Sequence, residues 1–300
     1  MPTLIVIAGP TASGKTSLAI RLAKYFSSEI ISADSRQFYK GLDIGTAKPT
    51  KEQLSSVRHH FIDSHEISDP YNISDYETDA LKKIEELFLK NEVVFLVGGS
   101  GLYIRAICHG INEIPGRDES IREKLIEMLD TYGIQALQNK IKELDAEYYN
   151  EVDLNNPHRL IRALEVCISS GQKYSSLRQA EIAPRPFNII KIGLLLDREE
   201  LYSRVENRVD EMISDGLVDE ARSLLPFRNA NALNTVGYKE LFEFFDNNCT
   251  LEQAIDAIKK NTRNYAKRQM TWFRKEEGIK WFDPEDTKLI IKYLEDELSK

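Results

Sequence analysis

Apolar residues occur in this chain in two patterns that predict different elements. Short continuous runs of β-branched and aliphatic residues predict buried strands, and apolar residues spaced three and four positions apart predict amphipathic helices. The expected strands lie at 4–8, 29–33, 93–97, 188–197 and 279–282. The expected helices lie at 17–25, 76–90, 201–213, 238–245 and 251–275. Because strands alternate with helices, we expect an α/β fold with a parallel sheet and right-handed crossovers.

The pattern changes between residues 118 and 186. Amphipathic helices are predicted at 120–132, 134–144 and 159–170, joined by polar loops and without a clear strand. The stretch Ala183-Pro184-Arg185-Pro186 closes this region. We therefore predict two domains. Residues 1–117 and 187–300 form the α/β core, and 118–186 form an all-helical insertion domain.

The first predicted strand ends in a phosphate-binding motif. Residues 9–16 read Gly-x-x-x-x-Gly-Lys-Thr and run directly into the first predicted helix. Gly9 and Gly14 let the backbone N–H groups curl inward, and the helix points its positive end at the same place. Lys15 adds a mobile cation, and the hydroxyl of Thr16 is suited to Mg²⁺. The core is thus predicted to be P-loop NTPase-like and to bind a di- or triphosphate, which need not be ATP.

The ends of two predicted strands bear on the chemistry. The strand at 29–33 ends at Asp34, and the strand at 93–97 ends in Gly98-Gly99. Ligands of parallel sheets bind at the carboxyl ends of strands, so we expect Asp34 beside the phosphate loop. The glycines replace the carboxylate of a typical ATPase, and they suit either close approach to a ligand or helix packing. Two reactions stay open: phosphoryl transfer, or attack on a carbon whose leaving group is a diphosphate.

Cations gather at two places in the C-terminal third. Arg204 and Arg208 are four residues apart on a predicted helix and share one face, either paired with neighbouring glutamates or directed at a ligand. Residues 259–275 hold seven cations and no acidic residue, with aromatic residues among them. This segment is either an RNA-binding helix or a partly buried helix whose long cationic side chains cover the core.

Composition restricts the classes of protein. The formal net charge of −8 argues against indiscriminate nucleic-acid binding, although a local basic surface can still bind RNA. Cys108, Cys167 and Cys249 are far apart, so neither a zinc site nor a disulfide framework is expected. No apolar run approaches the ~20 residues that span a bilayer. We expect a cytoplasmic protein that does not contact membranes.

Several blocks of the sequence, in the same order, are similar to those of one enzyme family. The blocks are 9–16, 32–39, 41–49, 97–103, 156–166, 236–238 and 262–274. They resemble the blocks of tRNA dimethylallyltransferases (isopentenyl-tRNA transferases) and cover nearly the whole chain. Ser100 and Lys239 depart mildly, since many members have Thr and Arg there. Because the zinc finger of eukaryotic members is absent, the chain resembles the compact bacterial form.

The resemblance implies transfer of a dimethylallyl group from dimethylallyl diphosphate to N6 of adenosine 37 in tRNA, with Mg²⁺ as cofactor. The P-loop would then hold the diphosphate of the donor, and the helical insertion would grip the anticodon stem. Arg208 falls where the family has a diphosphate-binding arginine, which favours the ligand interpretation of that residue. We expect a monomer whose partners are dimethylallyl diphosphate and the anticodon stem-loop of tRNA.

The resemblance also assigns roles by position. Asp34, Thr16 and Arg208 would be catalytic, with Asp34 accepting a proton from N6 and Thr16 holding the metal. The diphosphate would lie against Gly9, Pro10, Thr11, Ala12, Ser13, Gly14, Lys15 and Thr16. Contacts to tRNA would come from Asp34, Ser35, Arg36, Gln37, Ser100, Arg122, His158, Arg159, Leu160, Ile161, Arg162, Asn234, Thr235, Val236, Gly237, Tyr238, Lys239, Lys267, Arg268, Gln269, Trp272 and Arg274.

Two other functions stay open on the residues alone. The first is an ATP-dependent small-molecule kinase of P-loop type, and the second is a P-loop protein that binds RNA without catalysis. Incubation with Mg²⁺, labelled dimethylallyl diphosphate and total tRNA separates these from a prenyltransferase.

Overall fold

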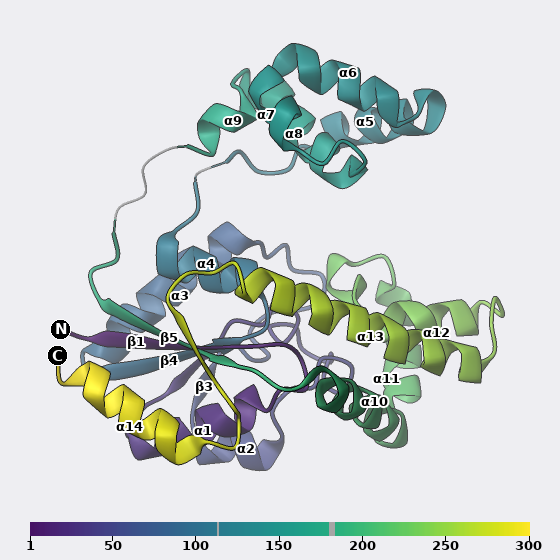
Figure 1. Cartoon of the computed structure of the whole chain (residues 1–300). Helices are drawn as coiled ribbons and strands as arrows, with labels where there is room; N and C mark the ends of the chain where they lie inside the picture. Colours follow the sequence, from purple (N-terminus) through teal and green to yellow (C-terminus); the bar gives the residue numbers. More distant parts are fainter. Residues whose placement is uncertain (113, 180–183) are drawn as a thin grey trace. The chain divides into compact units, whose positions relative to one another are not determined.

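The computed structural model describes residues 1–112, 114–179 and 184–300 (Figure 1). Their contacts divide the chain into two compact units. The first unit contains Met1–Cys108 and Arg185–Lys300, and the second contains His109–Pro184. The sequence prediction placed the insertion at 118–186, and Ala183 of its closing stretch lies outside the described residues.

The first unit is built on one parallel sheet. Its strands are β1 (Thr3–Ala8), β2 (Ile30–Ser32), β3 (His59–His60), β4 (Val93–Gly98), β5 (Asn188–Leu194) and β6 (Ile279–Phe282). They lie in the order β3-β2-β4-β1-β5-β6, and every pair is parallel. The predicted parallel α/β core is confirmed. The two-residue β3 was not predicted, because it is short and polar and shows no period-two pattern.

Helices cover both faces of the sheet, as Figure 1 shows. Leu4 and Val6 of β1 are buried with residues of α3 (Ile73–Phe88) and α4 (Gly101–His109). Ile5 and Ile7, which point the other way, are buried with α1 (Lys15–Tyr25) and α14 (Thr287–Leu298). Successive residues of a strand face opposite sides, so a continuous apolar run is the pattern expected for a strand covered on both faces.

A further group of helices follows β5. It contains α10 (Arg198–Ser214), α11 (Leu217–Ser223), η1 (Leu225–Phe227), η2 (Asn231–Leu233), α12 (Tyr238–Phe245) and α13 (Leu251–Phe273). In this group α13 packs against both α10 and α12. The Thr250 side chain accepts from the Gln253 N–H and the Gln253 side chain accepts from the Thr250 N–H, which starts α13. The short α2 (Lys51–Ser56) lies between β2 and β3 in the chain.

The regular secondary structure described in the second unit is all helical. It contains α5 (Glu119–Tyr132), α6 (Ile134–Leu144), α7 (Ala146–Glu151), α8 (Pro157–Ser170) and α9 (Tyr174–Leu177). Its own apolar core includes Leu125, Leu137, Ile141 and Leu164. In neither unit does a described helix have the length and apolar character needed to cross a membrane.

Candidate active site

The P-loop connects β1 to α1 and is tightly curled. Gly14 occupies the N-cap of α1 and has a φ of 83°. Residues with a Cβ rarely adopt such a positive φ, so glycine is favoured here. The Pro10 carbonyl accepts from the Ser13 hydroxyl at 2.8 Å and from the Lys15 ammonium at 2.5 Å. The Gly-x-x-x-x-Gly-Lys-Thr pattern therefore folds into the strand–loop–helix arrangement that its spacing predicts.

Two cations and one carboxylate from distant segments line a single cavity. Lys15 comes from the P-loop, Arg208 from α10, and Asp34 from the loop after β2. Arg208 Nη1 donates to the Thr11 hydroxyl at 3.2 Å, which joins α10 to the P-loop. Burial and the nearby Arg208 lower the pKa of Lys15 to about 7, although Asp34 opposes this shift. The cavity is thus an electropositive site with a carboxylate at its wall.

Asp34 follows the carboxyl end of β2 and lines the same cavity as Lys15 and Thr16 of the P-loop, as expected for parallel strands of one sheet. Its Oδ1 accepts from the Arg36 N–H at 2.9 Å, which fixes the direction of the carboxylate. Among the described residues the second oxygen, Oδ2, has no hydrogen-bond partner. This oxygen is available to a substrate that enters the cavity.

The two arginines of α10 have different surroundings. Arg204 pairs with Glu200 at 2.8 Å and is 34% exposed. Arg208 forms no ion pair with a described carboxylate, and burial lowers its pKa. The sequence left open whether these arginines pair with glutamates or face a ligand, and the structure gives a different answer for each. Arg204 lies in an ion pair on the surface, and Arg208 faces the cavity.

The glycines after β4 are explained by packing. A Cβ on Gly98 would lie 2.2 Å from the Ala33 carbonyl oxygen, at the end of the neighbouring β2. A Cβ on Gly101 would lie 2.3 Å from the Trp272 ring of α13. These glycines let β2 and α13 approach the end of β4 closely. Close packing therefore requires glycine at both positions, and Gly98 and Gly99 also line the cavity.

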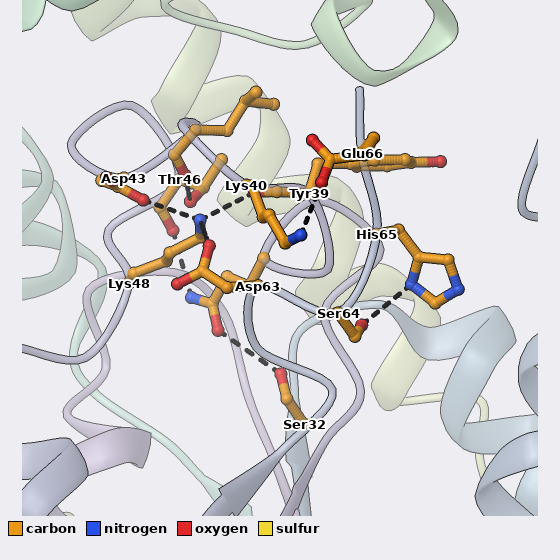
Figure 2. A network of polar contacts seen from close by, with 12 residues as sticks. Ser32, Tyr39, Lys40, Asp43, Thr46, Lys48, Asp63, Ser64, His65 and Glu66 are labelled. Carbon is orange, nitrogen blue, oxygen red and sulfur yellow. Dashed lines mark hydrogen bonds and ion pairs between the residues drawn. The ribbon is translucent and has the colours of Figure 1, made fainter. Parts of the chain in front are cut away.

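The loop after β2 forms another part of the cavity wall and is held by a buried lysine. Lys48 is 5% exposed and donates to the Tyr39 carbonyl and to Asp43, both at 2.7 Å (Figure 2). It also pairs with Asp63. Figure 2 shows these partners converging on the Lys48 ammonium from separate turns of the chain. The lysine therefore fixes the shape of this loop.

A glutamate of α11 holds the same loop from the other side. The Glu220 carboxylate accepts three consecutive backbone N–H groups, those of Asp43, Ile44 and Gly45, at 2.8 to 3.0 Å. It also accepts from the Tyr238 hydroxyl at 2.7 Å. Burial and Glu220 raise the pKa of Tyr238. Since Gly45 lines the cavity, Glu220 connects α11 to the cavity wall.

The positions assigned to tRNA near Asp34 are already hydrogen-bonded to one another and to nearby loops. The Ser35 N–H donates to the Ser100 hydroxyl at 3.1 Å, which joins the ends of β2 and β4. Arg36 donates to the Asn231 carbonyl at 2.7 Å. Gln37 donates to the carbonyls of Thr46 and Ala47 at 3.1 and 3.2 Å. These contacts preorganise the cavity entrance.

The block at 234–239 divides between surface and core. Asn234 and Lys239 are exposed. Thr235, Val236 and Gly237 line the cavity. The Tyr238 side chain is fully buried with its hydroxyl on Glu220, so it does not reach the surface.

The basic block of α13 divides in the same way. Lys267, Arg268 and Arg274 are exposed, and Trp272 is 38% exposed. Gln269 is only 7% exposed and points inward. The exposed cations are accessible to a ligand, whereas Gln269 is buried at the cavity wall, and RNA binding by this segment stays a prediction.

The assigned positions of the second unit form a cluster of their own. His158 and Arg159 are exposed at the start of α8. The side chains of Leu160 and Ile161 are buried in the helical core because they lie on the opposite face of α8. Arg122 and Arg162 both bind the buried Glu165, at 3.2 and 3.0 Å. Glu165 thus orients two arginines at the edge of this unit.

A metal would find few protein ligands in this site. Within 1–112, 114–179 and 184–300, no group of three or more His, Cys, Asp or Glu side chains is placed to hold an ion. Thr16 and Asp34 both line the cavity and offer oxygen ligands. Mg²⁺ is commonly held by a few protein oxygens together with substrate phosphates and water. The residues present fit such a metal only when a diphosphate is bound.

The sequence left three residues of this site without a role. Tyr265 lines the cavity and is 37% exposed; desolvation, and after it the nearby Asp34, raises its pKa to about 12. Glu220 and Lys48 hold the cavity wall. Glu220 binds backbone groups 175 to 177 positions away. Lys48 binds groups 5, 9 and 15 positions away, which form no regular spacing, so no local pattern reveals either role. The only signal was the aromatic position of Tyr265 within the basic segment.

Comparison with known proteins is consistent with this geometry. The family model described as IPP transferase matches residues 37–276. A tRNA dimethylallyltransferase of Christiangramia forsetii is 54% identical over 297 residues, which is 99% of this chain and 98% of the relative. This chain belongs to the tRNA dimethylallyltransferase family. A second family member, tRNA dimethylallyltransferase 1 of Bacteroides fragilis, is 50% identical over 98% of this chain and 97% of its own length.

Solved structures of the family have the same fold. The crystal structure of a tRNA isopentenylpyrophosphate transferase from Bacillus halodurans has a TM-score of 0.74 and 38% identity, covering 100% of this chain and 97% of that one. A eukaryotic dimethylallyltransferase acting on tRNA has a TM-score of 0.77 and 26% identity, covering 95% and 74%. The chain is therefore a transferase with a P-loop-like fold, and membership of this family leaves the kinase alternative without support.

Proposed function

We propose that this chain transfers a dimethylallyl group from dimethylallyl diphosphate to N6 of adenosine 37 in tRNA. The observation that supports this most is the convergence of Lys15, Arg208 and Asp34 on one cavity. Two cations suit a departing diphosphate, and one carboxylate suits a proton acceptor.

The P-loop residues 9–16 bind the diphosphate of the donor. Their N–H groups, the Lys15 ammonium and the Arg208 guanidinium take up the charge that grows on the diphosphate oxygens as the carbon–oxygen bond breaks. The electron pair of that bond leaves with the diphosphate. An allylic carbon ionises readily, so neutralising the leaving group supplies much of the rate.

Asp34 orients N6 and accepts its proton. The lone pair of N6 forms the new bond to the allylic carbon, and the proton released from N6 goes to the Asp34 carboxylate. An exocyclic amine is a weak nucleophile, so correct placement matters as much as basicity. The fixed carboxylate, held by the Arg36 N–H, suits this role.

Mg²⁺ is the proposed metal, with the Thr16 hydroxyl as its protein ligand. When bound, it would add positive charge beside the diphosphate oxygens. The nearby protein groups keep their own roles, since Lys15 and Arg208 bind the same anion.

Exposed cations bind the phosphates of the tRNA, and adenosine 37 turns out of its stack into the cavity. Lys267 and Arg268 of α13, and Arg274 directly after it, are accessible to phosphates. In the second unit, His158 and Arg159 are accessible in the same way. We propose that the enzyme acts as a monomer in the cytoplasm.

Carbon-labelled dimethylallyl diphosphate, total tRNA and Mg²⁺ test the proposal. We expect label in the RNA fraction and release of diphosphate. The absence of label from RNA, combined with ATP-dependent phosphorylation of a metabolite by the same preparation, would contradict it.

A further inference from the structure

Gln269 joins three segments that are far apart in the sequence. Its Oε1 accepts from the Thr11 N–H of the P-loop at 2.8 Å, and its Nε2 donates to the Gly99 carbonyl after β4 at 2.9 Å. Gln269 itself belongs to α13 and is 7% exposed. One side-chain amide therefore connects the P-loop, the end of β4 and the basic helix.

The space around this amide is closely fitted. A Cβ on Gly99 would lie 2.3 Å from Gln269 Nε2, so only a glycine allows the amide to reach the backbone. One turn further along α13, the Trp272 ring packs on Gly101 in the same close manner. The helix is thus fixed to the site at two successive turns.

The chemistry at this position requires both ends of an amide. Thr11 offers a donor and Gly99 offers an acceptor, and a buried backbone group without a partner is costly. A glutamate accepts from Thr11 but places a carboxylate against the Gly99 carbonyl. A methionine of similar volume satisfies neither group. Glutamine supplies an acceptor and a donor at the required reach.

We propose that Gln269 is a positioning residue that keeps the RNA-facing helix α13 in register with the phosphate loop. This inference rests on the proposed function, in which α13 holds tRNA and the P-loop holds the donor. Transfer needs N6 and the allylic carbon at near-contact distance, so a small shift between the two supports slows the reaction without preventing either substrate from binding. Gln269 lines the cavity, but both printed hydrogen bonds of its amide go to the protein backbone, so we assign it to holding the two supports rather than to binding tRNA.

The first test is Gln269→Met. We expect the single-turnover rate at saturating tRNA and donor to fall by about tenfold to a hundredfold. The Kd values for tRNA alone and for inorganic diphosphate alone should each change by less than about threefold. Asn229→Met, at an exposed amide outside α13 and outside the positions assigned to tRNA, is the matched control and should keep the wild-type rate.

The second test is Gln269→Glu across a range of pH. A protonated glutamic acid can accept from Thr11 and donate to Gly99, whereas the carboxylate cannot donate. The deficit in saturated rate relative to wild type should therefore shrink as the pH falls. This variant decides the matter if Gln269→Met does not fold.

Different results would contradict the role of Gln269 and the proposed function. A Gln269→Met enzyme with a wild-type saturated rate and weaker tRNA binding would make Gln269 an RNA contact and overturn the proposal. A Gln269→Glu deficit that does not change with pH would also overturn it. Wild-type enzyme that prenylates no tRNA would instead reject the proposed function itself.

Discussion

Asp34 carries the largest share of the proposed chemistry at the scale of single residues. One of its oxygens is fixed by the Arg36 N–H, and the carboxylate lines the cavity that Lys15 and Arg208 also line. The carboxylate can therefore receive a proton at the place where cations hold the leaving group.

Asp34→Asn or Asp34→Ala should lower the transfer rate by about 10²- to 10⁴-fold, because the proton acceptor is lost. Diphosphate binding should be largely retained, since Lys15 and Arg208 remain. Single-turnover transfer and calorimetric binding of diphosphate measure the two effects. Asp286→Asn, an exposed carboxylate at the start of α14, serves as the control. Unchanged turnover in Asp34→Asn would remove Asp34 from its proposed role.

Lys15 makes diphosphate binding depend on pH. Its pKa of about 7 means that much of the free enzyme has a neutral lysine at pH 8. A bound diphosphate favours the ammonium, so binding at pH 8 should take up a proton at Lys15. The affinity of wild type for diphosphate, relative to that of a variant with a permanent cation, should fall as the pH rises above 7.

Calorimetry at pH 8 in two buffers of different ionisation enthalpy measures this uptake. The Lys15→Arg variant has a permanent cation and serves as the reference. Subtracting its proton uptake from that of wild type removes the protons that diphosphate itself exchanges. We expect wild type to take up more protons on binding than Lys15→Arg. Equal proton uptake by the two proteins would show that Lys15 is already charged before binding.

Close packing of elements explains the glycines after β4. A Cβ on Gly98 would meet the backbone of Ala33, which cannot move away without disturbing β2. Gly98→Ala should therefore lower the free energy of unfolding by about 1–3 kcal/mol. Gly116→Ala is the matched control, since no atom lies within 4 Å of its added Cβ. Chemical denaturation measures both variants, and equal stabilities would refute the packing explanation.

The exposed face of α13 should contribute to RNA affinity through phosphates. Lys267→Ala or Arg268→Ala should weaken tRNA binding and reduce the slope of log K against log salt by about 1. Lys288→Ala, an exposed cation on α14, should leave this slope unchanged. Filter binding over a range of salt concentrations gives the slopes. An unchanged slope in both α13 variants would mean that these cations do not contact phosphates.

Local patterns predicted some elements better than others. Residues 134–144, 238–245 and 279–282 were predicted with the bounds that the structure has, because their apolar spacing is regular and turn residues flank them. The helix α14 was missed, and so was the two-residue β3. A strand this short has no period to detect, and it exists only because β2 lies beside it.

At the scale of the whole molecule, the sequence indicated which residues meet but not what holds them there. Asp34 could be placed beside the P-loop because parallel strands end at one edge of the sheet. The strand order could not be predicted, since it depends on long-range pairing. Glu220 and Gln269 bind backbone groups of distant loops, so neither role leaves a local signature in the sequence.

The proposed reaction requires a flipped adenosine and a prenyl donor to meet in one cavity of the enzyme. The most direct measurement is the mass of the nucleoside released from a tRNA anticodon stem-loop after incubation with enzyme, Mg²⁺ and dimethylallyl diphosphate. We predict adenosine carrying one dimethylallyl group on N6, and no product when adenosine 37 is replaced by guanosine. An unmodified adenosine from an RNA that binds the enzyme would contradict the account.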